Sequence, residues 1–311
     1  MVIAPQAELG QSISAGKTLL YSVTYNGNTN TGGSVPTDST LYEEADTATI
    51  LGNTGSLTKT NYVFDSWNTL ANGTGTSYDP DDTLTIGITG VTLYAQYVWQ
   101  PPQIANLVGA WVSGLSGAIS ALGTWEGQYG TTPDVTLVGA ATVGSDGLTV
   151  GATTGYGNLP NGTLIHDPMT IAFWMTWPGL TSDARIPFSA GAGAAGGAFL
   201  INIDYTRTAP WANNGWLSAP ITPAWNSSDL WVIRLNGTAL SISKNNGAST
   251  ASWTLATPIV WGNTFSRLAA HSGGDPAMKA SMDNVYIWDS ILTADEEASL
   301  WNYDPYRQGN L

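Results

Sequence analysis

Apolar and polar residues alternate with a period of two in several segments of the chain, which predicts β-strands. Residues 199–205 follow this pattern, and so do two segments on either side of Asn236-Gly237, a residue pair typical of tight hairpin turns. The longest alternation has an apolar face made by Met169, Ile171, Phe173, Met175 and Trp177. Six or seven such segments in the C-terminal two thirds of the chain suit a two-sheet antiparallel sandwich.

The most informative pattern lies in residues 282–302. Val285 and Ile287 alternate with polar or aromatic neighbours, so an extended strand there has one aliphatic face. Thr293 is followed three residues later by Glu296, and this spacing is a capping box that predicts the start of a helix. The neighbouring acids at 295 and 297 are explained by the positive end of the helix dipole. A strand followed by a capped helix is therefore expected.

The N-terminal third shows the same alternation at residues 19–25 and 91–99, with turn-forming residues between them. Phe64 and Trp67 are expected to be core residues, because an aromatic side chain in an alternating strand is usually packed. The adjacent prolines in Gln100 to Gln103 predict a short, stiff linker. The expected organisation is an N-terminal arm (1–16) that contacts a partner, a first module (17–99), the linker (100–103) and a second module (104–311).

Short motifs in a fixed order fill the first module: VTYNGN, GGSVP, YVFDSWNT, NGTGTSYDP and TLYAQY. Their order resembles the internalin B-repeat, or Listeria–Bacteroides repeat, family almost from end to end. The resemblance implies a small β-grasp-like module, which is common in bacterial surface proteins as a spacer or interaction unit. The chain departs from the family pattern at Tyr97, where tryptophan is common, and at Asp81, where glycine is frequent.

The second module contains LVGAWVSGLSG, GLTVGATTGYGNLP and the closing strand with its capped helix, including Leu292 and Leu300. Together these resemble laminin-G-like, concanavalin A-like jelly rolls, in which an early strand pairs with the last one. A generic strand followed by a surface helix is the alternative interpretation of the closing segment. The expected fold class is all-β: a small β-grasp-like module, then an antiparallel two-sheet jelly-roll sandwich with a short C-terminal helix.

The amino-acid composition excludes several classes of function. Only 10% of residues are charged, and 36 glycines and 14 tryptophans suit a turn-rich β protein. The net charge of -14 and nine scattered basic residues exclude a nucleic-acid partner. The chain has no cysteine and therefore no disulfide or thiolate metal site. It shows no apolar run of about 20 residues for membrane insertion and no secretory leader.

Catalytic motifs are absent from the sequence, so no enzyme activity is expected. Glucanases of this fold need two carboxylates on one strand face, about 5–9 Å apart, and no such spacing of acids occurs. His166 and His271 lie far apart and are interpreted as structural or surface residues. The acids of Asp79 to Asp82 are interpreted as a solvated turn. Calcium at Asp204 or Asp283, as in some laminin-G-like proteins, lacks a recognisable ligand set, so no cofactor is expected.

Aromatic residues gather among prolines and asparagines in residues 203–226, with little periodicity. An indole beside amide groups suits a sugar, because the ring covers the apolar sugar face and the amides bond its hydroxyls. Alternatively, these tryptophans fix a long loop onto the sandwich or fill a subunit interface. The candidate ligand-binding residues are Tyr205, Trp211, Asn213, Asn214, Trp216 and Trp225.

Both resemblances imply exposure and adhesion, yet the sequence shows neither an export signal nor an anchor. We therefore expect a non-enzymatic virion structural protein of a bacteriophage, either a capsid decoration or head-fibre protein or a tail-associated receptor-binding protein. Its location would be the virion surface, and its partners other virion proteins through residues 1–16 and a host surface glycan. A homotrimer suits this role. The alternative is a bacterial cell-surface adhesin, or an extracellular carbohydrate-binding fragment, without its signal and anchor.

Overall fold

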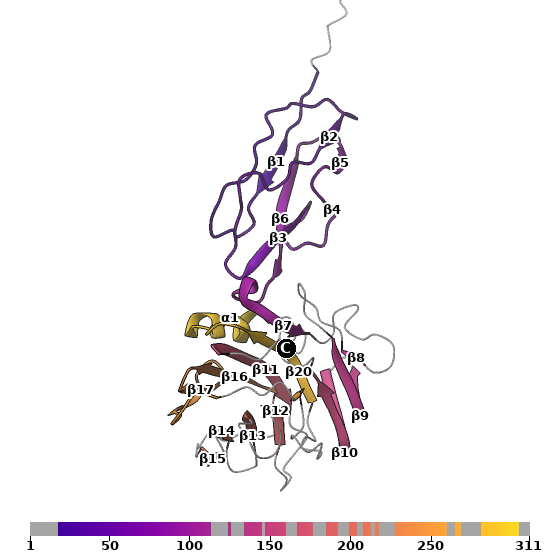
Figure 1. Cartoon of the computed structure of the whole chain (residues 1–311). Helices are drawn as coiled ribbons and strands as arrows, with labels where there is room; N and C mark the ends of the chain where they lie inside the picture. The colour runs from indigo at the N-terminus through magenta and orange to yellow at the C-terminus, as the bar shows by residue number, and fades with distance from the viewer. Residues whose placement is uncertain are drawn as a thin grey trace, which may run out of the picture. The chain divides into compact units, whose positions relative to one another are not determined.

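The computed structural model consists of two compact units, Met1–Gln100 and Pro101–Leu311 (Figure 1). Nearly all regular structure is β-strand, which confirms the all-β fold class. No helix in the described part of the chain is long and apolar enough to span a membrane. The structure describes residues 18–112, 124–125, 134–144, 147–159, 167–176, 185–191, 199–203, 208–212, 215–217, 228–259, 265–268 and 281–304. The predicted arm (1–16), His166, His271 and Asp204 lie outside these residues.

The first unit is built on a four-stranded sheet in the order β1-β6-β3-β4, beside a small β2-β5 ladder. β1 runs parallel to β6, and β3 runs antiparallel to it, so β6 lies between these two strands in the sheet. The period-two segment expected at 91–99 is this interior strand. The strands are β1 (Val23–Asn26), β2 (Thr47–Thr49), β3 (Tyr62–Asn68), β4 (Ser77–Tyr78), β5 (Thr83–Thr85) and β6 (Val91–Trp99).

Trp67 is the centre of the core of the first unit. Its side chain is fully buried, and its indole Nε1 donates a hydrogen bond to the Leu51 carbonyl at 2.9 Å. Tyr25 and Phe64 meet its ring edge-on, with centroid distances of 4.7 and 5.0 Å. Phe64 is half-buried at the border of this core. The prediction of two core aromatics is confirmed, with Trp67 inside and Phe64 at the edge.

The acidic segment Asp79 to Asp82 forms an exposed turn, as predicted. The Asp82 carboxylate accepts a hydrogen bond from the Asp79 backbone N–H at 2.8 Å, and the Asp81 N–H donates to the Ile50 carbonyl. Asp81 has a φ of +72°, in the left-handed region that favours glycine. The frequent glycine at this position of the family pattern therefore has a backbone explanation.

The second unit is a sandwich whose two layers are continuous through one long strand, β10 (Figure 1). The strands follow the order β15-β14-β13-β12-β19-β10-β20-β11-β16-β17-β18, with β7 also paired to β20. The elements are η1 (Ile104–Asn106), β7 (Leu107–Trp111), β8 (Thr124–Trp125), β9 (Val135–Gly144), β10 (Gly147–Asn158), β11 (Met169–Thr176), β12 (Arg185–Gly191), β13 (Phe199–Ile203), β14 (Thr208–Ala212), β15 (Gly215–Trp216), β16 (Ser228–Asn236), β17 (Ala239–Lys244), β18 (Ser249–Thr254), β19 (Phe265–Leu268), β20 (Ser281–Trp288) and α1 (Ala294–Tyr303).

Strand β10 joins the layers because its two ends pair with different strands. Its start, at Leu148, pairs with β20, and its end, at Gly157, pairs with β19. The sheet thus folds over one shared core, to which β11 and β16 contribute from one side and β12 and β19 from the other. The early strand β7 runs antiparallel to the last strand β20, as the laminin-G-like resemblance implied.

Helix α1 follows β20 and lies over the outer face of its layer. The capping box is present as predicted: the Thr293 hydroxyl accepts from the Glu296 N–H, and the Glu296 carboxylate accepts from the Thr293 N–H at 2.7 Å. Leu292 and Leu300 are buried. Asp304, just past the helix, accepts hydrogen bonds from Trp174 and Tyr286 of the sheet beneath it. The closing segment is therefore an integral part of the sandwich and not a loose surface helix.

The segment that opens the second unit is also fixed to its end. The Pro102 carbonyl accepts a hydrogen bond from the indole of Trp288 at 2.8 Å. The Gln103 side-chain amide donates to Ile291 and to the Glu296 carboxylate, at 3.2 and 2.8 Å. The prolines that we interpreted as a linker are therefore buried parts of the second unit.

Hairpin β16-β17 forms as expected, with Ile233 opposite Ile242 and Leu235 opposite Leu240. The two-residue turn is Gly237-Thr238, one position later than predicted, because Asn236 still pairs with Ala239 in the ladder. Gly237 supplies the positive φ, +59°. This register decides which side chains of the hairpin face outward.

Candidate ligand-binding site

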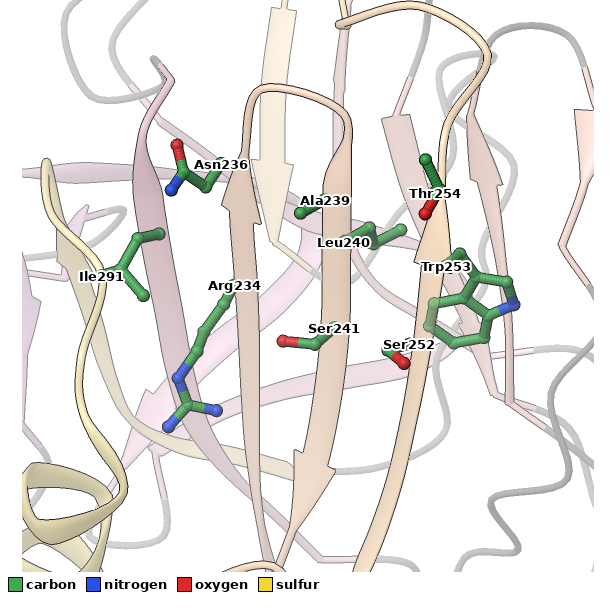
Figure 2. A pocket seen from close by; sticks show the side chains of 9 residues that line it. All are labelled: Arg234, Asn236, Ala239, Leu240, Ser241, Ser252, Trp253, Thr254 and Ile291. Atoms are coloured by element: carbon green, nitrogen blue, oxygen red, sulfur yellow. The ribbon is translucent and has the colours of Figure 1, made fainter.

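A pocket of about 460 Å³ lies on the outer face of β16, β17 and β18, beside the segment that leads into α1 (Figure 2). Three neighbouring strands form its floor, and Ile291 of the connecting segment forms one wall. Its volume is within the range of about 300–1,000 Å³ that small-molecule sites occupy. The lining residues are Arg234, Asn236, Ala239, Leu240, Ser241, Ser252, Trp253, Thr254 and Ile291.

The register of the three strands places the side chains of the pocket floor in two rows that run across the strands. Arg234 is opposite Ser241, which is opposite Ser252, and the next row on the same face is Asn236, Ala239 and Thr254. The intervening row, Leu235, Leu240 and Trp253, packs against the core of the sandwich. Because successive strand residues face opposite sides, the small and polar residues are placed together on the outside.

Uncharged polar groups dominate the pocket. Within the described part of the chain, the hydroxyls of Ser241 and Ser252 and the amide of Asn236 have no hydrogen-bond partner from the protein. Ala239 and Ile291 add apolar carbon. The site therefore offers hydrogen-bond donors and acceptors next to an apolar surface, a combination that suits a ligand with hydroxyl groups on a carbon ring.

Arg234 contributes little free charge to the pocket, because its guanidinium group is held by neighbours. Its Nε donates to the Leu292 carbonyl at 2.7 Å, and its NH1 donates to the Ser243 hydroxyl at 3.1 Å. Its NH2 forms an ion pair of 2.7 Å with the buried Glu297, which also accepts from the Ser243 hydroxyl. In Figure 2 the side chain extends toward α1 and away from Thr254.

Asp229 and Glu296 of the second unit have structural partners. Asp229 pairs with Lys244 at 3.4 Å and accepts from Asn245 at 2.6 Å. The pKa of Glu296 is lowered: burial alone would raise it, but hydrogen bonds from Thr293 and Gln103 and the charge of Arg234 outweigh burial. None of the nine lining residues is a carboxylate. Among the described residues, no three His, Asp or Glu side chains come close enough to hold a metal ion.

Two of the six sequence-predicted ligand residues, Trp211 and Trp216, lie in another part of the strand order. Trp211 in β14 and Trp216 in β15 occupy directly opposed register positions. Tyr205, Asn213, Asn214 and Trp225 lie outside the described residues, so the six-residue site stays a prediction. The segment contains two paired strands where we considered a long loop. β15 and β18 are at opposite ends of the strand order.

Sequence reasoning missed the pocket, and it explained Glu297 by the helix dipole alone. The available signal was Arg234, a cation among the apolar residues of 230–235, which needs a partner when its neighbours are buried. Small residues at alternate positions of β17 and β18 were a second signal, because they leave space on one sheet face. The partner of Arg234 lies 63 positions away, beyond the reach of local patterns.

Two family models match the chain. Residues 21–96 match the Listeria–Bacteroides repeat domain, and residues 151–296 match the concanavalin A-like lectin/glucanases superfamily. The modules and their order are those that the sequence motifs predicted. The second match favours a domain of a carbohydrate-binding or adhesive type.

Individual proteins resemble parts of the chain. A protein of Evansella cellulosilytica, named "Putative Gly-rich membrane protein", is 36% identical over 77 residues, which are 25% of this chain and 9% of that protein. Trypanosoma rangeli sialidase in complex with sialic acid has a TM-score of 0.52 at 16% identity, covering 66% of this chain and 34% of the sialidase. A mutant of that sialidase displaying trans-sialidase activity has a TM-score of 0.53 at 16% identity, covering 67% of this chain and 34% of its own. The two likenesses to the sialidase concern the fold alone.

Proposed function

We propose that this chain, a Listeria–Bacteroides repeat domain followed by a concanavalin A-like domain, is a surface-displayed adhesion protein that binds a glycan without cleaving it. The observation that carries this proposal is the pocket on β16, β17 and β18, which combines hydroxyl, amide and apolar groups and has no carboxylate among its lining residues. Glycoside hydrolysis ordinarily uses a pair of carboxylates at the scissile bond. A pocket of this composition can hold a sugar but has no acid to protonate a leaving group.

The arrangement of two buried acids also supports binding over hydrolysis. Glu297 is held by Arg234 and Ser243, Asp229 by Lys244 and Asn245, and each interaction crosses between elements of the sandwich. A catalytic acid must exchange protons with substrate, whereas these groups hold strands and helix together. The matched superfamily includes glucanases, so activity needs a direct test.

The test uses the purified full chain in two assays. On a glycan array we expect concentration-dependent binding to at least one oligosaccharide. In a reducing-sugar assay on the bound polysaccharide class we expect no release above a heat-denatured control. An array without any bound glycan would refute glycan binding. Release of reducing sugar would instead refute the non-enzymatic part of the proposal.

Display at a surface is the wider part of the proposal. The match to the Listeria–Bacteroides repeat supports display, because the resemblance implies a module that is common in bacterial surface proteins. The relative from Evansella carries the name of a membrane protein. The display surface is either a bacteriophage virion, with residues 1–16 contacting other virion proteins, or a bacterial cell. Immunogold labelling of phage particles and of intact cells separates the two, because the label should decorate only one of them.

A further inference from the structure

We infer that the pocket on the outer face of β16, β17 and β18 is the glycan subsite, and that it selects uncharged sugars over sialylated or otherwise anionic ones. This inference rests on the proposed glycan binding, which cites the same pocket, and it adds the residues that contact the sugar and the class of the ligand.

The positions of the polar groups suit a pyranose ring. Ser241 and Ser252 are directly opposed on adjacent antiparallel strands, so their hydroxyls rise from neighbouring points of one rigid floor. Asn236 stands in the next row, where its amide can both donate and accept. Ala239, between Asn236 and Thr254, leaves open space above the strand for the apolar face of a ring. Sugar hydroxyls would thereby replace water on groups that the protein leaves available.

The charge of the pocket argues for an uncharged ligand. Arg234 is the one cation among the nine lining residues, and Glu297 and Ser243 hold its guanidinium group. A carboxylate that enters the pocket would lose hydration and gain no free cation in exchange, which is unfavourable. The net charge of -14 repels anionic glycans further. Sialic acid, the ligand of the sialidase with a similar fold, is therefore a poor ligand for this pocket.

The floor is also fixed before any ligand arrives. β16 and β17 pair over six successive positions without a register shift, and β17 and β18 pair over another six. The Arg234–Glu297 contact fixes this face to α1. Binding to a preformed sheet surface loses little conformational entropy.

The experiment compares variants of the full chain on an array of neutral gluco-, galacto- and arabino-oligosaccharides and sialylated galacto-oligosaccharides, followed by calorimetric titration with the strongest neutral binder. The double variant Ser241→Val, Ser252→Val removes two hydroxyls and keeps residues suited to strands, so we expect about a 10-fold loss of affinity or more. Ala239→Phe fills the pocket from an exposed position and should reduce affinity at least as much. Thr250→Val is the matched control, because Thr250 is exposed on β18 outside the lining set.

The outcomes separate this inference from the proposed function. Binding of neutral glycans that falls in the double variant and in Ala239→Phe, but stays within two-fold in Thr250→Val, supports the inference, provided that thermal melting shows all variants folded. Undiminished binding in both pocket variants overturns the assignment of the site and leaves glycan binding intact. A preference of the unmodified chain for sialylated glycans overturns the selectivity. An array with no signal overturns both proposals.

Discussion

Glu297 provides the sharpest test of how the second unit is held together. The sequence explained Asp295 and Glu297 equally, as acids in the first turn of a helix. The structure separates them. Asp295 is exposed, whereas the Glu297 side chain is 5% exposed and accepts hydrogen bonds from Arg234, Ser243 and the backbone N–H of Gly247. Glu297→Ala and Asp295→Ala should therefore differ strongly in their effect on stability.

The magnitude follows from what each substitution leaves behind. Glu297→Ala leaves the guanidinium group of Arg234, whose side chain is 15% exposed, without its counter-charge. Breaking a buried ion pair on one side typically costs about 3–5 kcal/mol. Asp295→Ala removes a favourable interaction with the helix dipole that is worth about 0.3–1 kcal/mol. The expected difference between the two variants is therefore about 3 kcal/mol.

Urea unfolding monitored by tryptophan fluorescence measures this difference. Two of the 14 tryptophans, Trp67 and Trp99, belong to the first unit, so the remaining 12 make the signal report mainly on the second unit. At a slope of about 2 kcal/mol per molar urea, a loss of 4 kcal/mol lowers the midpoint by about 2 M. Arg234→Met combined with Glu297→Ala should cost less than the sum of the single variants, because no isolated charge remains. Equal midpoints for Glu297→Ala and Asp295→Ala would show that the ion pair does not stabilise the fold.

Three further predictions concern the rest of the chain. Trp67→Phe should destabilise the first unit by about 1–3 kcal/mol in calorimetry, because the hydrogen bond to Leu51 and ring contacts are lost; an unchanged melting transition would contradict its central place in the core. Ala45→Gly should stabilise this unit by about 0.5–1 kcal/mol, because Ala45 is exposed with a φ of +69°; a lower melting temperature would mean that backbone strain is negligible there. The lowered pKa of Glu296 gives stability that is present above its ordinary pKa of 4.5 and is lost as the pH falls through the folded value. Glu296→Gln should therefore destabilise more at pH 7 than at pH 3, and an equal effect at both pH values would refute this.

Local patterns predicted the parts of the fold that depend on local geometry. The alternation at 169–176 became β11, and the capping box of Thr293 and Glu296 formed as written. Both follow from neighbours in sequence, since a strand face repeats every two residues and a helix start needs an acceptor three residues before its partner. The hairpin turn was placed one residue too early, because Asn236 takes a ladder position that local turn preferences do not reveal.

The candidate site could not be predicted in the same way, because it depends on pairing between strands. Ser241 and Ser252 are 11 residues apart and meet only through the register of β17 and β18. The Arg234–Glu297 contact needs α1 to lie over the hairpin. The sequence analysis placed the binding site in residues 203–226 instead, because aromatic residues are concentrated there. Composition shows where tryptophans are concentrated in the sequence, but it does not show which part of the surface forms a pocket. Register and the position of a covering helix are tertiary properties.

The Arg234–Glu297 contact connects the stability of the sandwich with the chemistry of the pocket. Arg234 lines the pocket, and the ion pair with Glu297 compensates its positive charge. A ligand therefore meets no free cation as long as this ion pair is intact. Glu297→Gln keeps the size of the side chain and an acceptor oxygen for Ser243, but it removes the counter-charge of Arg234. The pocket should then present a cation, and the preference on the glycan array should shift from neutral toward sialylated oligosaccharides. If the folded variant keeps the original preference, the selectivity of the site does not depend on the neutralisation of Arg234.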